Sequence, residues 1–513
     1  MNQVWNIFRK DARHHWPEIL VSLAILVAFA WVEIRSWGHF DPTLDLTFVF
    51  ARFLPGLVNV LVPLSWIFLI VRVVQGETLV GDRQFWVTRP YDWKVLLAAK
   101  ALFVLAFIHL PLFLMDAFLL SRAGFHPENY VVGLLWMQLM WIPTLFLFAF
   151  ALAAIAKNLP QMLVVVLFVV LYIIGLVAIS QVVPDSDYSP GSDWWMPVLL
   201  DGTAIVVLFL QYSRRRTGIS RWLVAAALLT FGLIVTFLPY RSLILRAYPV
   251  LPSALPGEFT LLPPNNNEGT YLDEGEDVSI RLPLSLSQLP KDAFVELNGM
   301  IATLTNASGF RWDSGWKGQY LSFYPDQKSA ELSFEVKHPL FDKLKSFPVS
   351  LRLLLALTTY HDKNQREFVV PKGKFSLPDV GICSADQRGY WYSIRCQAPL
   401  RTPKFLLITS EMAASTCLSK KEIAPIPGLL SHGSVRGGDS DPAEMGISPI
   451  HQVDIYLSGW DVPGTHIQNP GICPGTPLTL SNPQAIGHSR VELQFDNLSL
   501  TDYQKGGGRI VIR

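Results

Sequence analysis

The stretch GETLVGDRQFWVTRPYDWK, residues 76–94, lies between two apolar runs at residues 53–74 and 95–120. It contains acidic and basic side chains, two tryptophans and a proline, none of which a simple tether between membrane helices needs. Each flanking run reaches the about 20 apolar residues that a helix needs to cross a bilayer. The pattern predicts a membrane protein in which this loop is a contact surface for a partner.

The composition divides the chain into two halves. Hydrophobic residues make up 50% of the 513 residues, and they crowd the first 250 positions. Basic and acidic side chains number 18 and 14 through Val250, and 24 and 27 after it. Neither half has the strong positive charge of a nucleic-acid-binding domain, so no nucleic-acid partner is predicted. We expect a membrane domain followed by a water-exposed domain.

Seven apolar runs predict membrane-spanning helices within residues 18–245. The sixth is the weakest because it is short and contains Asp201 and Gly202. With a cytoplasmic N-terminus, seven crossings place 13 of the 18 basic residues inside, as the positive-inside rule requires. We therefore predict a multi-pass protein of the inner (plasma) membrane with an extracytoplasmic C-terminal domain. The predicted spans are residues 19–32, 53–74, 95–120, 130–156, 161–183, 196–211 and 222–238.

Residues 1–17 alternate apolar and basic side chains. Val4, Trp5, Ile7 and Phe8 are interleaved with basic residues that begin at Arg9. This pattern favours an amphipathic helix on the inner membrane surface, in contact with lipid. The alternative is a basic flank that only sets the orientation of the first span.

Residues 246–513 have the composition of an all-β region. Runs such as Ala330-Glu-Leu-Ser-Phe-Glu-Val alternate apolar and polar residues, and prolines, asparagines and glycines punctuate them. A period of two marks half-buried strands, and frequent turns favour sandwich architecture. We predict two β-sandwiches, residues 246–378 and 379–513, divided near Pro378.

All four cysteines lie in this β region, which favours disulfides in an oxidising compartment. Three pairings are possible. We prefer a local bridge between Cys383 and Cys396, because a turn at residues 386–389 separates two strand-like runs, and this leaves Cys417 to pair with Cys473. Four buried free thiols are the alternative.

Four polar residues inside the predicted spans are candidates for a polar pathway: Asn59, His109, Asp116 and Gln138. Polar groups are unfavourable in lipid, so they usually face protein or water. Because Asp116 lies near the outer end of its span, snorkelling or a contact between helices is an equally good explanation for it.

The loop and its flanks resemble the coupling region of ABC exporter permeases of the second type. In that family an acidic residue after the second span precedes a hydrophobic stretch, a Thr/Ser-x-Pro turn and a lysine that opens the third span. Here Glu77, Phe85 to Val87, Thr88 to Pro90 and Lys100 occupy those places. The resemblance covers roughly residues 1–215. The family core has six spans with both termini inside, so the seventh span and the exported domain depart from it.

The resemblance implies the membrane-spanning subunit of an ABC-type exporter, a homodimer or a heterodimer with a second permease. No GxxxxGK[ST] motif is present, so ATP hydrolysis is expected in a separate ATPase subunit. In the loop, aromatic anchors would enter a groove of that partner and charges would set its orientation. The residues expected to couple to the ATPase are Glu77, Asp82, Arg83, Phe85, Trp86, Arg89 and Pro90.

Three alternatives stay open at this stage. In the first alternative, the loop is a surface segment that packs against its own N-terminal helix. In the second, the protein is a non-transporting membrane sensor or assembly factor with a ligand-binding β domain. An exported enzyme is disfavoured, because the sequence shows no G-x-S-x-G or H-E-x-x-H arrangement, and no catalytic residue, metal ligand or cofactor is predicted.

Overall fold

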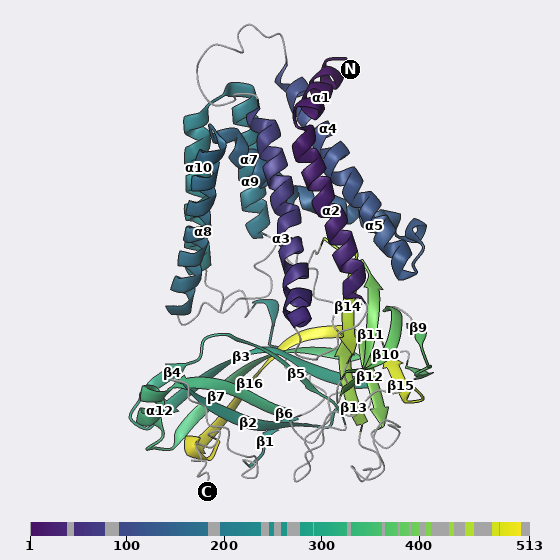
Figure 1. The fold of residues 1–513 in the computed structure, drawn as a ribbon. Coiled ribbons are helices and arrows are strands. Elements are labelled where there is room, and N and C mark those ends of the chain that lie inside the picture. Colours follow the sequence, from purple (N-terminus) through teal and green to yellow (C-terminus); the bar gives the residue numbers. More distant parts are fainter. Residues whose placement is uncertain are drawn as a thin grey trace.

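The structure is a computed structural model in which an N-terminal bundle of apolar helices is followed by a region of β-sheets (Figure 1). The residues that it describes are 2–37, 46–76, 92–182, 195–237, 246–250, 258–263, 277–290, 292–325, 330–361, 365–377, 380–388, 391–400, 406–411, 430–435, 447–455, 474–481 and 483–503.

The helical region alternates long α-helices with three short π-helical stretches. Prolines explain part of this pattern, because Pro111 and Pro143 lack the backbone N–H that a regular helix uses. The helices are α1 (Asn2–His14), α2 (Trp16–Ser36), α3 (Leu46–Gln75), α4 (Trp93–Val104), η1 (Leu105–His109), α5 (Leu110–Ala123), η2 (Pro127–Tyr130), α6 (Val131–Trp141), η3 (Ile142–Phe146), α7 (Leu147–Ile155), α8 (Leu159–Val182), α9 (Trp195–Phe209), η4 (Leu210–Arg214) and α10 (Thr217–Phe237).

Six helices among the described residues are long and apolar enough to cross a membrane. They correspond to six of the seven predicted spans, and the segments α4–η1–α5 and η2–α6–η3–α7 each form one of them. The remaining predicted span, residues 196–211, forms α9 and η4, of which α9 has 15 residues. The prediction of a helical membrane bundle is confirmed.

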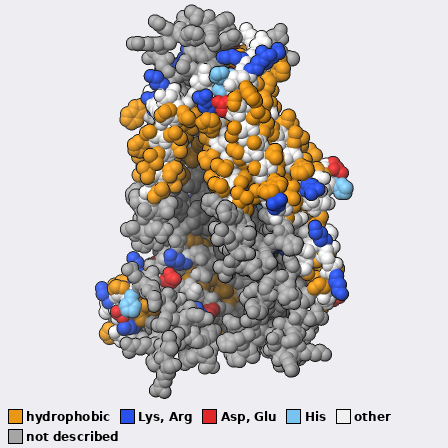
Figure 2. Space-filling view, viewed as in Figure 1, with side chains coloured by type: hydrophobic (Ala, Val, Ile, Leu, Met, Phe, Trp, Pro, Cys, Tyr) orange, Lys and Arg blue, Asp and Glu red, His pale blue; other side chains and the backbone are white. Residues whose placement is uncertain are grey.

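A belt of hydrophobic side chains covers the described part of the bundle on the face that Figure 2 shows. Val132 on α6 is 82% exposed, and Phe168 on α8 and Leu229 on α10 are similarly uncovered. Apolar residues in such numbers on an outer surface are expected where the solvent is lipid. The inside of the bundle is closed by a core to which α2, α3, α4 and α5 contribute.

The N-terminal helix and the β-sheets lie at opposite ends of the bundle (Figure 1). Helix α1 and the start of α4 are at one end, whereas both groups of sheets lie beyond the other end. A chain that enters the bundle at one end and leaves it at the other runs along it an odd number of times. The six longer apolar segments alone would give an even number, so between α2 and α10 the shorter α9 has to be counted as well.

The first group of strands forms two sheets around one core, which joins Ile280 and Leu332 of one sheet to Leu297 and Leu353 of the other. Residues at every second position of β6 are buried, as the predicted alternation requires. The strands are β1 (Glu258–Leu261), β2 (Asp277–Ser287), β3 (Ala293–Asn306), β4 (Arg311–Asp313), β5 (Lys317–Phe323), β6 (Ala330–Lys337), β7 (Val349–His361) and β16 (Gln484–Leu498), with helix α12 (His338–Leu344) between β6 and β7 and the short η7 (Leu500–Tyr503) after β16.

The second group also forms two sheets around a smaller core, which contains Leu377, Ile394 and Leu480. All its strand pairs are antiparallel. The orders are β14-β11-β10-β9 and β13-β12-β15-β8, and the strands are β8 (Arg366–Val369), β9 (Lys374–Leu377), β10 (Gly381–Arg388), β11 (Trp391–Pro399), β12 (Leu406–Glu411), β13 (Leu430–Val435), β14 (Ile450–Ile455) and β15 (Pro477–Ser481).

The chain passes between the two groups of strands twice. Strands β8 and β9 lie before the predicted division near residue 378, yet they pair with β15 and β10 of the second group. Strand β16 returns to the first group and pairs along its length with β7. The period of two reveals individual strands, but it contains no information about which distant strand each one pairs with.

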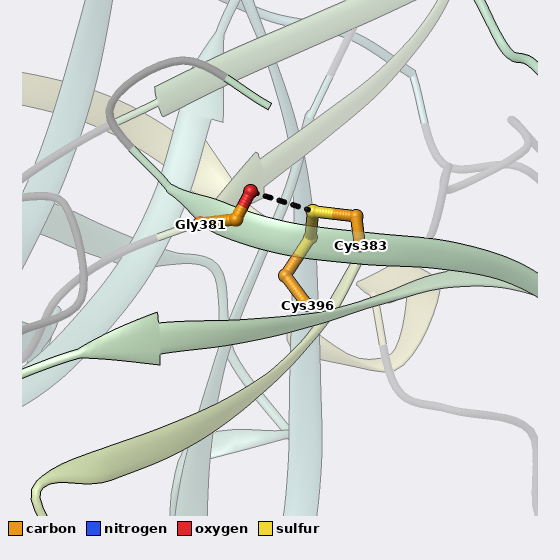
Figure 3. The surroundings of a disulfide bond; sticks show 3 residues. All are labelled: Gly381, Cys383 and Cys396. Atoms are coloured by element: carbon orange, nitrogen blue, oxygen red, sulfur yellow. Dashed lines mark hydrogen bonds between the residues drawn. A yellow bond between two sulfur atoms is a disulfide. The ribbon is translucent and has the colours of Figure 1, made fainter. Parts of the chain in front are cut away.

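The predicted bridge between Cys383 and Cys396 is present (Figure 3). The two residues are direct partners on β10 and β11, and both side chains are buried in the second core. The Gly381 carbonyl oxygen lies 3.9 Å from the Cys383 sulfur, which has no proton to donate once it is oxidised. Cys417 and Cys473 lie outside the described residues.

Candidate coupling and intramembrane sites

The seven predicted coupling residues, Glu77 to Pro90, lie outside the described residues. The ends of the loop are described. Helix α3 ends at Gln75, and Gly76 follows it with a backbone hydrogen bond to the Arg72 carbonyl. On the other side Asp92 caps α4, because its side chain accepts a hydrogen bond from the Lys94 backbone N–H at 3.3 Å. The loop therefore starts and ends on two membrane helices.

Helix α1 is tied to α4 by an ion pair between Asp11 and Lys100. Lys100 Nζ lies 2.7 Å from Asp11 Oδ2, and the two side chains are only 1% and 6% exposed. A charge-assisted hydrogen bond with both partners buried is stronger and more directional than a surface pair. The resemblance matches Lys100 to the lysine that opens the third span in ABC exporter permeases. In this structure Lys100 is bound to the N-terminal helix.

Aromatic side chains reinforce the same contact. Phe8 of α1 stacks on Phe107 with ring centroids 5.7 Å apart and meets Phe103 edge to face at 6.5 Å. Ile7 and Asp11 face inward, whereas Arg9 is exposed, so α1 is amphipathic as predicted. The helix buries its apolar face on α4 and presents its basic face outward.

A second polar cluster joins the α1–α2 corner to the end of α3. Arg72 donates hydrogen bonds of 3.4 Å to Glu18, and His15 Nδ1 lies 3.8 Å from the same carboxylate. A Cβ added at Gly76 would lie 3.4 Å from His15 Nε2, so the buried imidazole lies beside the root of the loop. Burial, and next the charge of His14, lower the pKa of His15 below its ordinary value. The loop is thus held to the N-terminal region at both ends.

Three of the four predicted pathway residues form a hydrogen-bonded chain inside the bundle. His109 Nδ1 lies 3.0 Å from Gln138 Oε1, and Gln138 Nε2 donates to Asp116 Oδ2 at 3.0 Å. His109 and Gln138 are 8% and 6% exposed, and Asp116 is fully buried. The side chains come from η1, α5 and α6, so the chain joins the third and fourth membrane passes. It is a contact between helices, one of the two explanations open for Asp116.

The fourth candidate, Asn59, is not part of this cluster. It lies on α3 and is exposed on the apolar exterior of the bundle. Sequence identifies a polar residue in a span, but only the rotation of the helix decides which way that residue faces.

The hydrogen-bonded chain lies where two helices leave regular α-geometry. His109 is the last residue of η1, and its ring meets Phe146 of η3 edge to face at 5.1 Å. Trp66 of α3 contacts Phe146 at 5.9 Å from the other side. Single π-turns in membrane helices often occur at functional sites, where they reorient side chains. Asp116 Oδ1 is buried without a hydrogen-bond partner among the described residues.

The hairpin between α5 and α6 is the contact with the second group of strands. Leu400, at the end of β11, rests directly against Gly133, where a Cβ would collide with its side chain. At Gly124, which follows α5 with a φ of 96°, an added Cβ would lie 3.0 Å from Ile382 Cδ1 of β10. Leu400 itself has a positive φ of 62° and is held by Pro449 and His451. Two small residues on the hairpin therefore accept two large apolar side chains from the β-sheet.

Asp11 and His15 were not predicted as site residues. A signal for them does exist, because Ile7, Asp11 and His15 recur every four residues, and His15, directly after α1, continues the face of Ile7 and Asp11 through its backbone hydrogen bond to Asp11. An acid on the inner face of a basic helix predicts a buried cationic partner. The partner itself lies 89 residues away, and no spacing rule identifies it.

Comparison with known proteins does not place this geometry in a family. No protein-family model matches the chain, and no curated protein matches it. The resemblance to ABC exporter permeases therefore depends on the loop residues and on the order of the spans around them.

Proposed function

We propose that this chain is the membrane-spanning subunit of an ABC-type exporter, driven by a separate ATPase that docks on the loop at residues 77–91. The observation that carries the proposal is the buried pair of Asp11 and Lys100. It joins the N-terminal helix to the helix that follows the loop, so a force on the loop acts on α1 and α4 together.

The third membrane pass offers a path for that force. Helices α4, η1 and α5 follow each other without a break from Trp93 to Ala123. One end of this helical segment is bound to α1, and its middle carries the hydrogen bond between His109 and Gln138. Its far end contacts Ile382 in the β region. Movement at the ATPase end would therefore tilt the third and fourth passes against their neighbours and reach the exported domain.

The distribution of charge supports a cytoplasmic position for the end that carries α1. Lys and Arg side chains gather at that end of the hydrophobic belt (Figure 2). In the described residues they include Arg9, Lys10, Arg13, Arg72, Lys94, Lys157, Arg214, Arg215, Arg216 and Arg221. By the positive-inside rule this end faces the cytoplasm, where an ATPase has its nucleotide. The disulfide at the other end agrees with an oxidising exterior.

The docking assignment is tested by purifying the full chain from its native membrane with and without a triple alanine change at Glu77, Arg83 and Phe85. The wild type should retain an ATPase with Walker motifs and its ATP-driven activity, and the triple variant should lose both. A control replaces Glu335, Lys337 and Phe347, which are likewise one acidic, one basic and one aromatic residue and are exposed in the β region. If the loop variant retained the ATPase as the control does, the docking assignment would fail.

The second candidate is a non-transporting sensor or assembly factor. The close contact of Leu400 with Gly133 favours it, because a ligand on the β region would act directly on the fourth pass without any ATPase. This candidate predicts that no Walker-motif protein co-purifies with the wild-type chain. It also predicts that changes in the 77–91 loop leave the function intact, while changes at the Leu400 contact abolish it.

A further inference from the structure

A cavity of about 580 Å³ lies between the α5–α6 hairpin and the second group of strands. One wall is formed by hairpin residues within 124–130, and the other is formed by residues of β9 and β10 together with Val380 and Pro399. Its volume is in the range of ligand-binding pockets. It lies apart from the His109–Gln138–Asp116 chain and from the loop that follows α3.

The lining of the cavity is apolar at its base. Leu377, Val380 and Ile382 line it from the β region, and Phe125 and Tyr130 form an edge-to-face pair 5.9 Å apart on the hairpin. No Lys, Arg, Asp or Glu is among the described residues that line it. A small charged molecule inside the cavity would therefore lack a Lys, Arg, Asp or Glu partner among these residues, so apolar contact must supply the binding energy.

Polar side chains are present on the exposed surfaces of both walls. Asn129 and His126 lie on the hairpin wall, Ser376 lies on the strand wall, and all three are exposed. An apolar base with an uncharged polar rim suits a molecule that has an apolar chain and a polar head. The walls are fixed by the approach of Gly124 to Ile382 and by the Cys383–Cys396 bridge one residue further along β10.

The location of the cavity indicates which amphipathic molecule it binds. Gly124 directly follows one membrane pass and Pro127 begins the next, so the mouth of the cavity lies at the level where the bilayer ends. Lipids are the amphipathic molecules that surround a protein at this level. We propose that the cavity binds an acyl chain of a phospholipid from this leaflet, with the headgroup at the polar rim. This inference holds for either candidate function.

Photo-crosslinking tests the proposal in the full chain reconstituted in phosphatidylcholine nanodiscs. A phosphatidylcholine with a diazirine on its acyl chain should label Leu377 and Val380, which are buried residues of the cavity lining. Ser376→Trp and Asn129→Trp each add a ring at an exposed position of one wall. Each should reduce this labelling by about tenfold, which corresponds to the loss of about 1.4 kcal/mol of binding.

Two controls decide the outcome. Lys374→Trp places the same ring at an exposed position of the same strand outside the lining, and its labelling should equal that of the wild type. Excess unlabelled phosphatidylcholine should compete, whereas glycerophosphocholine, the headgroup without chains, should not. Labelling confined to the membrane passes, labelling unchanged by both cavity variants, or competition by the headgroup alone would overturn the proposal.

Discussion

Asp11 and Lys100 are 89 residues apart in the chain, yet their side chains meet at 2.7 Å in a site from which water is almost excluded. Asp11 belongs to the helix before the first span, and Lys100 belongs to the third. The pair therefore makes the N-terminal helix a structural part of the bundle and joins it to the helix that continues from the loop.

Removing one member of this pair should destabilise the protein more than removing both. Lys100→Met leaves an uncompensated buried carboxylate, and Asp11→Leu leaves a buried ammonium, so each should cost about 3–5 kcal/mol. The double variant removes both charges and should recover most of that loss. Thermal unfolding in detergent measures the difference, with the exposed Lys94→Met as control. A loss in the double variant equal to the sum of the two single losses would show that the ion pair contributes no coupling.

The stability of the α1–α2 corner should depend on pH through His15. Because burial lowers its folded pKa below 6.5, the unfolded chain binds a proton in a range where folded His15 remains neutral. Stability should therefore be retained above pH 6.5 and fall as the pH drops through the lowered pKa. We expect a decrease in Tm between about pH 7.5 and about pH 5.5 that His15→Gln reduces. His338→Gln, an exposed histidine of the β region, serves as control, and an unchanged pH dependence in His15→Gln would contradict the assignment.

The direction of the intramembrane hydrogen bonds predicts that replacing Asp116 with Asn and with Leu has unequal effects on stability. The Asp116 side chain accepts from Gln138, so Asp116→Asn retains an acceptor and should change stability little. Asp116→Leu leaves the buried amide without a partner and should cost about 1–3 kcal/mol. The exposed Asn59→Leu should be neutral or stabilising in detergent. Equal effects of Asn and Leu at position 116 would show that the acceptor is unimportant.

Sequence predicted those features that depend on local pattern. The bridge between Cys383 and Cys396 followed from two strand-like runs around a turn, and β10 and β11 pair in that register. His109, Asp116 and Gln138 lie together inside the bundle, as expected because polar groups inside spans usually face protein. Asn59 lies apart from them, since a polar residue type does not reveal the orientation of its helix.

Sequence did not predict what depends on distant pairing. The return of β16 to β7 and the partnership of Asp11 with Lys100 each join segments far apart in the chain. Alternation in β16 and the four-residue repeat in α1 indicate that one face is buried, but not by which neighbour. The contact of Leu400 with Gly133 belongs to the same class.

Loss of the disulfide should destabilise the second group of strands. The bridge joins two neighbouring strands across a separation of 13 residues, and a loop of this size corresponds to about 3 kcal/mol in the chain-entropy description. Replacing both Cys383 and Cys396 with serine should make residues 380–400 sensitive to protease at lower temperature. Reductant should have the same effect on the wild type. Any further effect of reductant on the double variant would come from the predicted pair of Cys417 and Cys473.

The contact between Gly133 and Leu400 predicts a pair of compensating changes. A Cβ at position 133 would collide with the Leu400 side chain, whose backbone is already held at a positive φ. Gly133→Ala should therefore cost about 1–3 kcal/mol by overpacking and loosen the β region from the hairpin. Leu400→Ala makes room, so the double variant should be more stable than Gly133→Ala alone. Thermal unfolding and protease cleavage between the two regions measure both effects. Gly175→Ala on α8, where a Cβ meets no atom within 4 Å, is the matched control. If Gly133→Ala behaved like this control, the hairpin would not depend on this close approach, and the proposed path from the third and fourth passes to the β region would lose its support.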